Sequence, residues 1–242
     1  MHLSFQETLS NAWQRVDGAK ATIWAGIGIF LPIIALIVFL NMMIENNFFL
    51  NLLTDLLFTL FNAGLVYLGI KRAQDFPIQY TQIFYPLHPG IILRLVVVAI
   101  VKYIITLIPI LIFIFLVALL LQLFSSWRET ILIIAKPVGL LIVVTSLIYL
   151  QIRMILSTAF ILDRHADFWS AIQLSFQATR GQFWHLFLLY LFTLFSILLS
   201  IIPFGVGLIW SLPFAFILYG TIYKEMATPS VKPSPAKRAF DA

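Results

Sequence analysis

The chain has no cysteine and very little charge. Of its 242 residues, only 10% are Asp, Glu, Lys or Arg, whereas soluble domains carry about 25%. The absence of cysteine excludes disulfide frameworks and thiolate metal sites. The shortage of charge argues against a water-soluble domain, because such a domain would expose large apolar patches and aggregate.

Catalytic and cofactor motifs are also absent. The sequence contains no G-x-S-x-G, H-E-x-x-H, P-loop or dinucleotide fingerprint. Its four histidines do not fall into a metal-ligand spacing. The net charge of +5 is scattered at the ends of apolar segments, as in membrane proteins, and forms no nucleic-acid patch. We therefore expect no enzymatic activity, no cofactor, no metal and no nucleic-acid partner.

What the chain has instead is long apolar runs. Its residues are 62% hydrophobic, and a spanning helix needs about 20 mostly apolar residues. A large soluble all-α core is the alternative, but the runs are too long for it. The third and fourth runs exceed what a bilayer requires, so they are expected to be tilted or partly interfacial. Six segments qualify as spans: about 21–42, about 48–70, within 91–123, within 131–161, about 183–201 and about 204–223.

The distribution of Lys and Arg predicts the orientation. Basic residues concentrate on the cytoplasmic side of membrane proteins, so both termini are expected in the cytoplasm. The loops at about 43–47, 124–130 and 202–203 are then expected on the outer side, with Arg128 and Lys136 the basic residues there. The cytoplasmic set comprises Arg15, Lys20, Lys71, Arg72, Arg164, Arg180, Lys224, Lys232, Lys237 and Arg238.

An internal repeat organises the chain. The segment "FQETLSNAWQRVDG" (5–18) aligns with "FWSAIQLSFQATRG" (168–181), and residues 76–90 fit the same frame one residue longer. Chance similarity among amphipathic segments is the alternative. The repeat predicts an all-α domain over residues 1–225, built from units at about 1–70, 76–161 and 167–225. Each unit would be a cytoplasmic interfacial amphipathic helix followed by a two-span hairpin. The Pro-rich and basic segment 226–242 is expected to be a disordered tail.

The segment at 168–181 shows this unit most clearly. We expect a helix with Phe168, Ile172 and Phe176 toward the acyl chains and Arg180 toward water, because these positions follow a helical period. Gly181 would be the hinge, and Trp184 would mark the interface where the fifth span begins.

Ionisable residues within spans are candidate functional groups. Asp55 lies in the second span and Lys102 in the third, so a buried ion pair is one hypothesis. A neutral Asp55 that hydrogen-bonds Asn51, Thr59 or another helix is the other. Arg153, at the end of the fourth span, is expected to anchor the cytoplasmic end of that span.

Residues 149–187 carry a family pattern. It comprises Arg153, Asp163-Arg164, Ala171-Ile172, Thr179-Arg180-Gly181 and Trp184. The pattern resembles the YciC-like group of uncharacterised bacterial inner-membrane proteins. It is also similar to the membrane domain attached to some glycerophosphoryl diester phosphodiesterases. The resemblance implies the bacterial inner membrane as location, but no biochemical activity.

Two functions follow as hypotheses. The first is a structural, lipid-organising or accessory role, with membrane lipids bound between the helices and a membrane protein or a second copy as partner. The second is a small permease for a lipid-like or apolar solute. The permease hypothesis depends on the Asp55–Lys102 pair and on prolines that would kink the spans. Against it, the spans lack the polar residues that a water-filled path needs.

Overall fold

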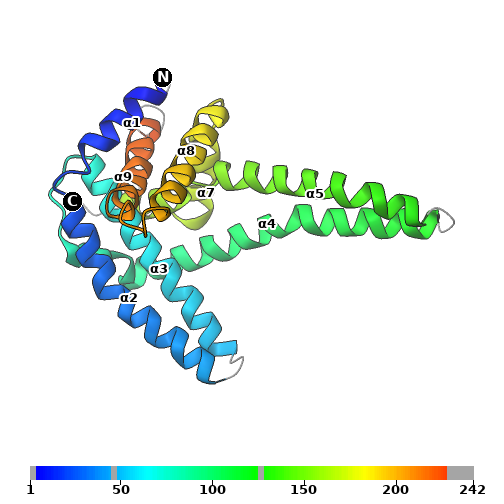
Figure 1. Cartoon of the computed structure of the whole chain (residues 1–242), viewed down its shortest axis with the longest axis horizontal. Coiled ribbons are helices and arrows are strands. Elements are labelled where there is room, and N and C mark those ends of the chain that lie inside the picture. The colour runs from blue at the N-terminus through cyan, green and yellow to red at the C-terminus, as the bar shows by residue number, and fades with distance from the viewer. Residues whose placement is uncertain (1–3, 45–47, 125–127, 228–242) are drawn as a thin grey trace.

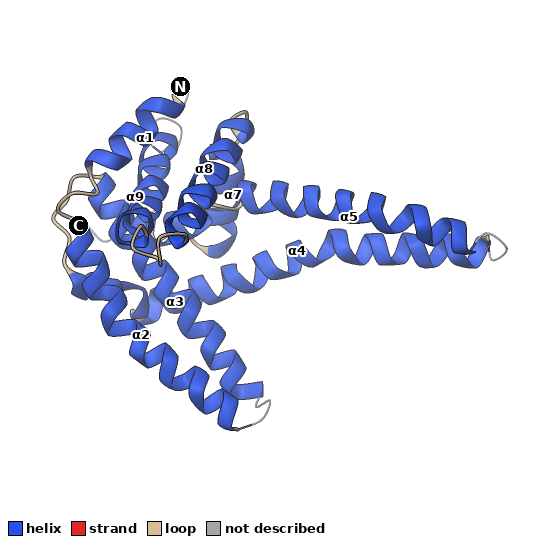
Figure 2. Cartoon of the chain, viewed as in Figure 1, coloured by secondary structure: helices blue, strands red, loops and turns tan. Residues whose placement is uncertain are grey.

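The computed structural model describes residues 4–44, 48–124 and 128–227, and all of their regular structure is helical (Figure 2). The expected disordered tail lies almost entirely outside these residues, as do most of the first two hairpin loops. The helices are α1 (Phe5–Gln14), α2 (Lys20–Met43), α3 (Phe48–Ala73), the 3-10 helix η1 (Tyr80–Leu87), α4 (Pro89–Leu123), α5 (Arg128–Arg153), α6 (Ser157–Arg164), α7 (Phe168–Ala178), α8 (Phe183–Ile201) and α9 (Leu208–Ala227).

Five segments of the described chain are long and apolar enough to cross a membrane. The protein is thus a helical multi-pass membrane protein, as its composition predicts. Helix α9, which we expected to be the sixth span, is not among them. Its second half carries Lys224 and Glu225 and is largely buried against other helices. The five segments are Lys20–Met43, Phe48–Ala73, Pro89–Leu123, Pro137–Arg164 and Phe183–Ile201.

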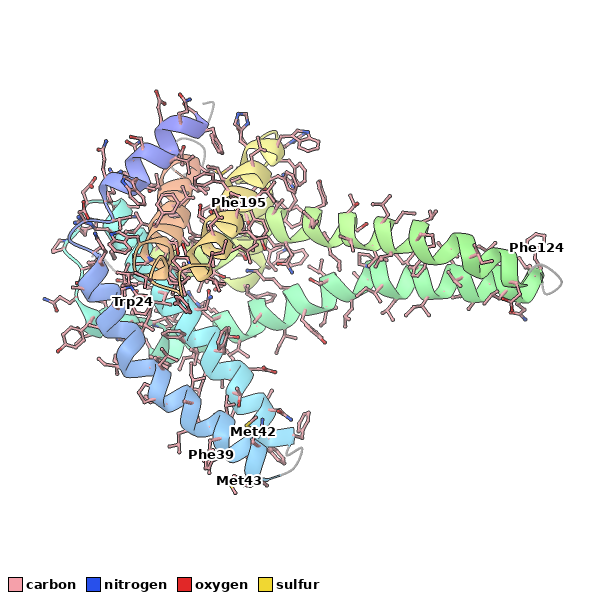
Figure 3. The ribbon with its side chains drawn as sticks, viewed as in Figure 1. Trp24, Phe39, Met42, Met43, Phe124 and Phe195 are labelled. Atoms are coloured by element: carbon pink, nitrogen blue, oxygen red, sulfur yellow. The ribbon has the colours of Figure 1, made fainter. Side chains whose placement is uncertain are left out.

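Two helical hairpins project from a common body (Figure 1). One is α2 with α3, and the other is α4 with α5. Helix α4 has 35 residues, which corresponds to about 52 Å at 1.5 Å per residue and exceeds a bilayer core of about 30 Å. Figure 3 shows Phe39, Met42 and Met43 gathered near the tip of the first hairpin and Phe124 at the tip of the second. These exposed apolar tips are suited to lipid and not to water.

The body is held together by a close crossing of α3 and α9. A side chain at Gly69 would collide with the backbone carbonyl of Phe216, and one at Gly220 would collide with the carbonyl of Gly69. Small residues allow helix backbones to approach in this way, which gains dispersion contacts where lipid offers no hydrophobic driving force. The two glycines therefore fix where α9 lies.

The connection between α3 and α4 differs from the predicted unit. We expected an interfacial α-helix there, but the chain forms the 3-10 helix η1, whose Ile83 is buried between α2 and α3. A side chain at Gly64 would strike the backbone of Ile83, so η1 lies directly against α3. Pro86 supplies the physical reason, because it lacks an N–H and disrupts α-helical bonding. Gly90 lies in the first turn of α4 and is not a hinge.

Helices α1 and α7 match each other in which positions are buried. Each is followed by a glycine in the left-handed region, Gly18 at φ +84° and Gly181 at φ +78°, where glycine carries no steric penalty. The apolar stripes are divided, because Val16 and Ile172 are buried in the protein whereas Trp13 and Phe168 are exposed. The repeat itself stays a prediction. The buried positions that correspond are Thr8, Ala12 and Val16 in the first segment and Ala171, Ser175 and Thr179 in the second, and Ile172 is buried in the second segment alone.

A short break separates α5 from α6, and Ser175 of α7 bridges it. The Ser175 hydroxyl donates to the carbonyl of Arg153 at 2.8 Å and accepts from the N–H of Leu156 at 3.2 Å. Interrupting a helix in a membrane leaves backbone groups that must find partners inside the protein. Ser175 satisfies one donor and one acceptor with a single side chain.

Both ends of the described chain meet on one face of the body. Thr8 of α1 donates to the Glu225 carboxylate of α9 at 2.7 Å. The start of α9 also lies close to the start of α2, because Trp24 donates to the carbonyl of Ile209 at 3.2 Å. We expected the loop before α9 on the outer side and Lys20 on the cytoplasmic side, yet the Lys20 ammonium lies 5.4 Å from the Trp210 ring. Helix α9 therefore packs across the base of the first hairpin, and the side of the membrane on which the loop at 202–203 lies stays a prediction.

Asp75 joins three parts of this face. Its carboxylate accepts from Arg15 at 2.9 Å and from Lys224 at 3.1 Å. These hydrogen bonds lower the pKa of Asp75 from 3.8 to about 2. A depressed pKa means that the folded state favours the ionised form, so the link stabilises the fold fully above pH 3.8 and is lost as the pH falls through about 2.

We therefore expect the melting temperature of the detergent-purified protein to depend less on pH between 4 and 2 in Asp75→Asn than in the wild type. Asparagine also tolerates the left-handed backbone of this residue (φ +65°), so the change tests charge and not strain. Asp17→Asn, which removes a more exposed carboxylate from the same face, is the control. Equal pH dependence in the wild type and Asp75→Asn would contradict the assignment.

Candidate functional site

Lys102 lies inside a predicted span, on the side of α4 that faces α6. Its ammonium donates to the hydroxyl of Thr158 at 3.2 Å. No carboxylate among the described residues forms an ion pair with it. An unpaired charge within a membrane span costs about 2.5–3.5 kcal/mol on insertion scales. A cation retained at such a position needs an anionic or strongly polar partner.

Two cavities meet at Lys102. The first, of about 560 Å³, lies between α3 and α4 and includes Phe58, Leu95 and Tyr103 in its lining. The second, of about 350 Å³, extends toward α8 and α9 and includes Ile148 and Tyr190. Both volumes fall in the range of small-molecule sites. Four residues, which we call the polar quartet, line both cavities: Asn62, Lys102, Gln151 and Thr158.

The polar quartet draws its residues from four helices. Asn62 comes from α3, Lys102 from α4, Gln151 from α5 and Thr158 from α6. The surrounding walls are mostly aliphatic and aromatic, and neither lining includes a carboxylate. The site therefore combines one cation and three hydrogen-bonding groups with two apolar chambers.

Asp55 does not belong to this site. Its side chain is exposed, and its backbone carbonyl accepts from Thr59. The expectation that Asp55 is buried among helices is wrong. Asp55 lies on α3 seven residues before Asn62, about 10 Å closer to the tip of its hairpin. There the two hairpins have already diverged (Figure 1), so the same helix face meets no neighbour.

Arg153 lies at the end of α5, where the fourth span breaks. Its guanidinium carbon is 5.0 Å from the centre of the Phe176 ring of α7, which is within cation–π range. Its Nε atom is buried and makes no hydrogen bond among the described residues. Arg153 therefore packs α5 against α7, and it lines neither of the two cavities.

The structure also places the residues predicted at 168–184. Ile172 is only 5% exposed and packs inside the protein, which corrects its expected lipid-facing position. Phe168 and Trp184 are exposed, as is Arg180. Phe176 is half-buried against the core and under Arg153. None of these side chains contributes to the polar quartet.

The chain was compared with protein families, curated proteins and solved structures. No protein-family model, curated protein or solved structure matches the chain. Within the described residues, no group of three His, Cys, Asp or Glu side chains is placed to hold a metal ion. The candidate site is thus defined by its own geometry, as a cationic and hydrogen-bonding centre between two apolar cavities.

Lys102 is predictable from its charge within an apolar run, but its three companions were not predicted. Asn62, Gln151 and Thr158 are isolated polar residues within apolar runs, which is the feature that could have indicated them. Gln151 and Thr158 are also seven residues apart, close to two helical turns. Their convergence on Lys102 depends on how α3, α4 and α6 pack, which no local pattern encodes.

Proposed function

We propose that the protein binds a phospholipid between its helices, with the lipid phosphate at Lys102 and the acyl chains in the two cavities. The observation that carries this proposal is the polar quartet shared by two apolar chambers. A phospholipid has the same pattern, with one anionic group joined to two hydrocarbon chains. The bound phosphate would neutralise the ammonium and accept hydrogen bonds from Thr158, Asn62 and Gln151.

The permease hypothesis has less support. It required Asp55 and Lys102 as a buried pair, and Asp55 is exposed. A lipid-organising or accessory role needs only stable binding, which the polar quartet offers. No catalytic group is required for either role.

The shared face of the termini supports an orientation for this role. Thr8 contacts Glu225, and Asp75 contacts both Arg15 and Lys224, so these segments lie on one side of the protein. We propose that this side is cytoplasmic, because Lys and Arg concentrate there. The bacterial inner membrane stays an expectation of the family resemblance.

Native mass spectrometry from a mild detergent tests the proposal. The wild type should retain a phospholipid, and Lys102→Met should retain it roughly tenfold less, because a hydrogen bond to a charged group is worth about 1.5–3 kcal/mol. Methionine keeps the unbranched shape of lysine and removes the charge, so packing changes little.

Lys71→Met is the matched control. Lys71 also carries a positive charge, but its ammonium lies over the rings of Tyr67 and Phe76 and it lines neither cavity. Lipid retention should be unchanged in this variant. Equal lipid retention by Lys102→Met and the wild type, with both variants melting normally, would refute the Lys102 site.

A further inference from the structure

A third cavity lies apart from the Lys102 site, between α1, α8 and α9. Its volume is about 430 Å³. It shares no lining residue with the two cavities at Lys102. Its wall combines four aromatic residues with four serines. The aromatic residues are Trp13, Phe192, Trp210 and Phe214, and the serines are Ser10, Ser196, Ser200 and Ser211.

One of these serines stands out. Ser211 is only 8% exposed, and its hydroxyl oxygen is buried and makes no hydrogen bond within the described part of the chain. Ser196 and Ser200 donate to helix carbonyls one turn earlier, at 2.8 and 2.7 Å. A buried hydroxyl without a partner costs about 1–3 kcal/mol. Ser211 is also one of the residues that line the cavity, so this unpartnered hydroxyl belongs to its wall.

Small residues form one part of the cavity wall, and packed aromatic rings form another. A side chain at Gly207 would strike Ser200, so glycine lets the start of α9 lie close to the end of α8 at the cavity wall. The Phe214 ring packs edge-on against Trp13 at 5.7 Å and against Phe192 at 6.3 Å between ring centres. Trp13 and Trp210 are 57% and 39% exposed, so they still present free surface. Free aromatic surface beside a hydrogen-bond donor suits a flat ring that carries oxygen.

We infer that this cavity is a second binding site, for a planar ring that bears a carbonyl oxygen, the chemistry of a quinone dissolved in the membrane. The Ser211 hydroxyl donates to the carbonyl, and the rings of Trp13 and Trp210 pack on the ring plane. An acyl chain would fill the apolar volume but would leave Ser211 without an acceptor at this depth. The need for an acceptor oxygen beside Ser211 therefore favours the carbonyl-bearing ring over an acyl chain.

One wall residue of the cavity, Trp210, also contacts the start of the first hairpin. The Lys20 ammonium lies 5.4 Å from the centre of the Trp210 ring and pairs with Asp17 at 2.7 Å. This contact holds the Trp210 indole between α2 and α9. A residue of the first hairpin thus helps to position the Trp210 ring, although the residues that line the cavity come from α1, α8, α9 and Gly207.

Fluorine NMR of the full-length protein labelled with 5-fluorotryptophan tests the inference, with menadione as the probe. The resonances of Trp13 and Trp210, assigned with Trp→Phe variants, should shift saturably on titration. Those of Trp169 and Trp184, which do not line the cavity, should not. Ser211→Ala should weaken menadione binding roughly fivefold, the loss of one hydrogen bond.

The control probe is 2-methylnaphthalene, which has the same ring shape without oxygen. Its weaker binding should be equal in the wild type and Ser211→Ala. Equal menadione binding by both proteins would overturn the role of Ser211. Equal shifts at all labelled tryptophans would show partition into detergent and overturn the site. Neither result depends on lipid binding at Lys102.

Discussion

Replacing Gly220 by alanine is expected to prevent the protein from folding stably. The added carbon would collide with the backbone carbonyl of Gly69 and lie 2.8 Å from the amide nitrogen of Ile70. Backbone atoms cannot rotate away as a side chain can, so α3 and α9 must separate. Overpacking a core usually costs about 1–3 kcal/mol, and a clash between two backbones should exceed that range. The measurement is the yield and melting temperature of monodisperse protein in detergent.

Gly28→Ala is the matched control for this substitution. Gly28 lies in α2 and is exposed, with open space where a side chain would go. Alanine is favoured over glycine in a helix by about 1 kcal/mol, so this variant should be as stable as the wild type or slightly more stable. If Gly220→Ala melted like Gly28→Ala, the close crossing of α3 and α9 would be disproved.

Ser175→Ala is expected to lower the free energy of unfolding by about 1–3 kcal/mol, because it leaves a buried backbone N–H without a partner and weakens the bonding of a carbonyl. The N–H of Leu156 would lose its partner at the break between α5 and α6, and the carbonyl of Arg153 would keep only the long hydrogen bond from the Thr179 hydroxyl at 3.5 Å. Ser175 is fully buried, so water cannot replace its hydroxyl. Chemical or thermal unfolding in detergent would measure the loss.

Ser196→Ala separates this effect from the loss of any serine. The Ser196 hydroxyl donates only to the carbonyl of Phe192 within its own helix, which already accepts a helical bond. Its removal should cost a few tenths of a kcal/mol at most. Similar losses in the two variants would mean that Ser175 does not stabilise the break.

The membrane helices could be predicted closely from the sequence. The predicted span 21–42 became Lys20–Met43, and 183–201 became Phe183–Ile201. Such agreement is expected, because a bilayer offers no water to the backbone and each apolar run must form its backbone hydrogen bonds within its own helix. The excess length predicted for the third run is also observed in α4.

The packing of α9 could not be predicted in this way. Its composition indicated another span, but its position depends on two glycines from distant parts of the chain, Gly69 and Gly220. Glycine is common in membrane helices, so its presence alone does not reveal which pair meets.

The candidate site was predictable only in part. Lys102 could be found from its charge in an apolar run, while Asp55 was found by the same rule and lies outside the site. The difference arises because the hairpins converge near Lys102 and diverge before Asp55 (Figure 1). Depth along a helix decides which polar residue meets a neighbour, and the sequence alone does not supply that depth.

The contact between Thr8 and Glu225 bears on how the protein is made. These residues are 217 positions apart, so the first helix leaves the ribosome long before its partner exists. During synthesis α1 has neither Glu225 nor the Asp75–Lys224 link to hold it. The backbone of Gly69 on α3 likewise lacks its contact with Gly220 until α9 has been made. Translation of α9 therefore completes the assembly, and a nascent chain that stops before α9 leaves both the first helix and the first hairpin without their final contacts.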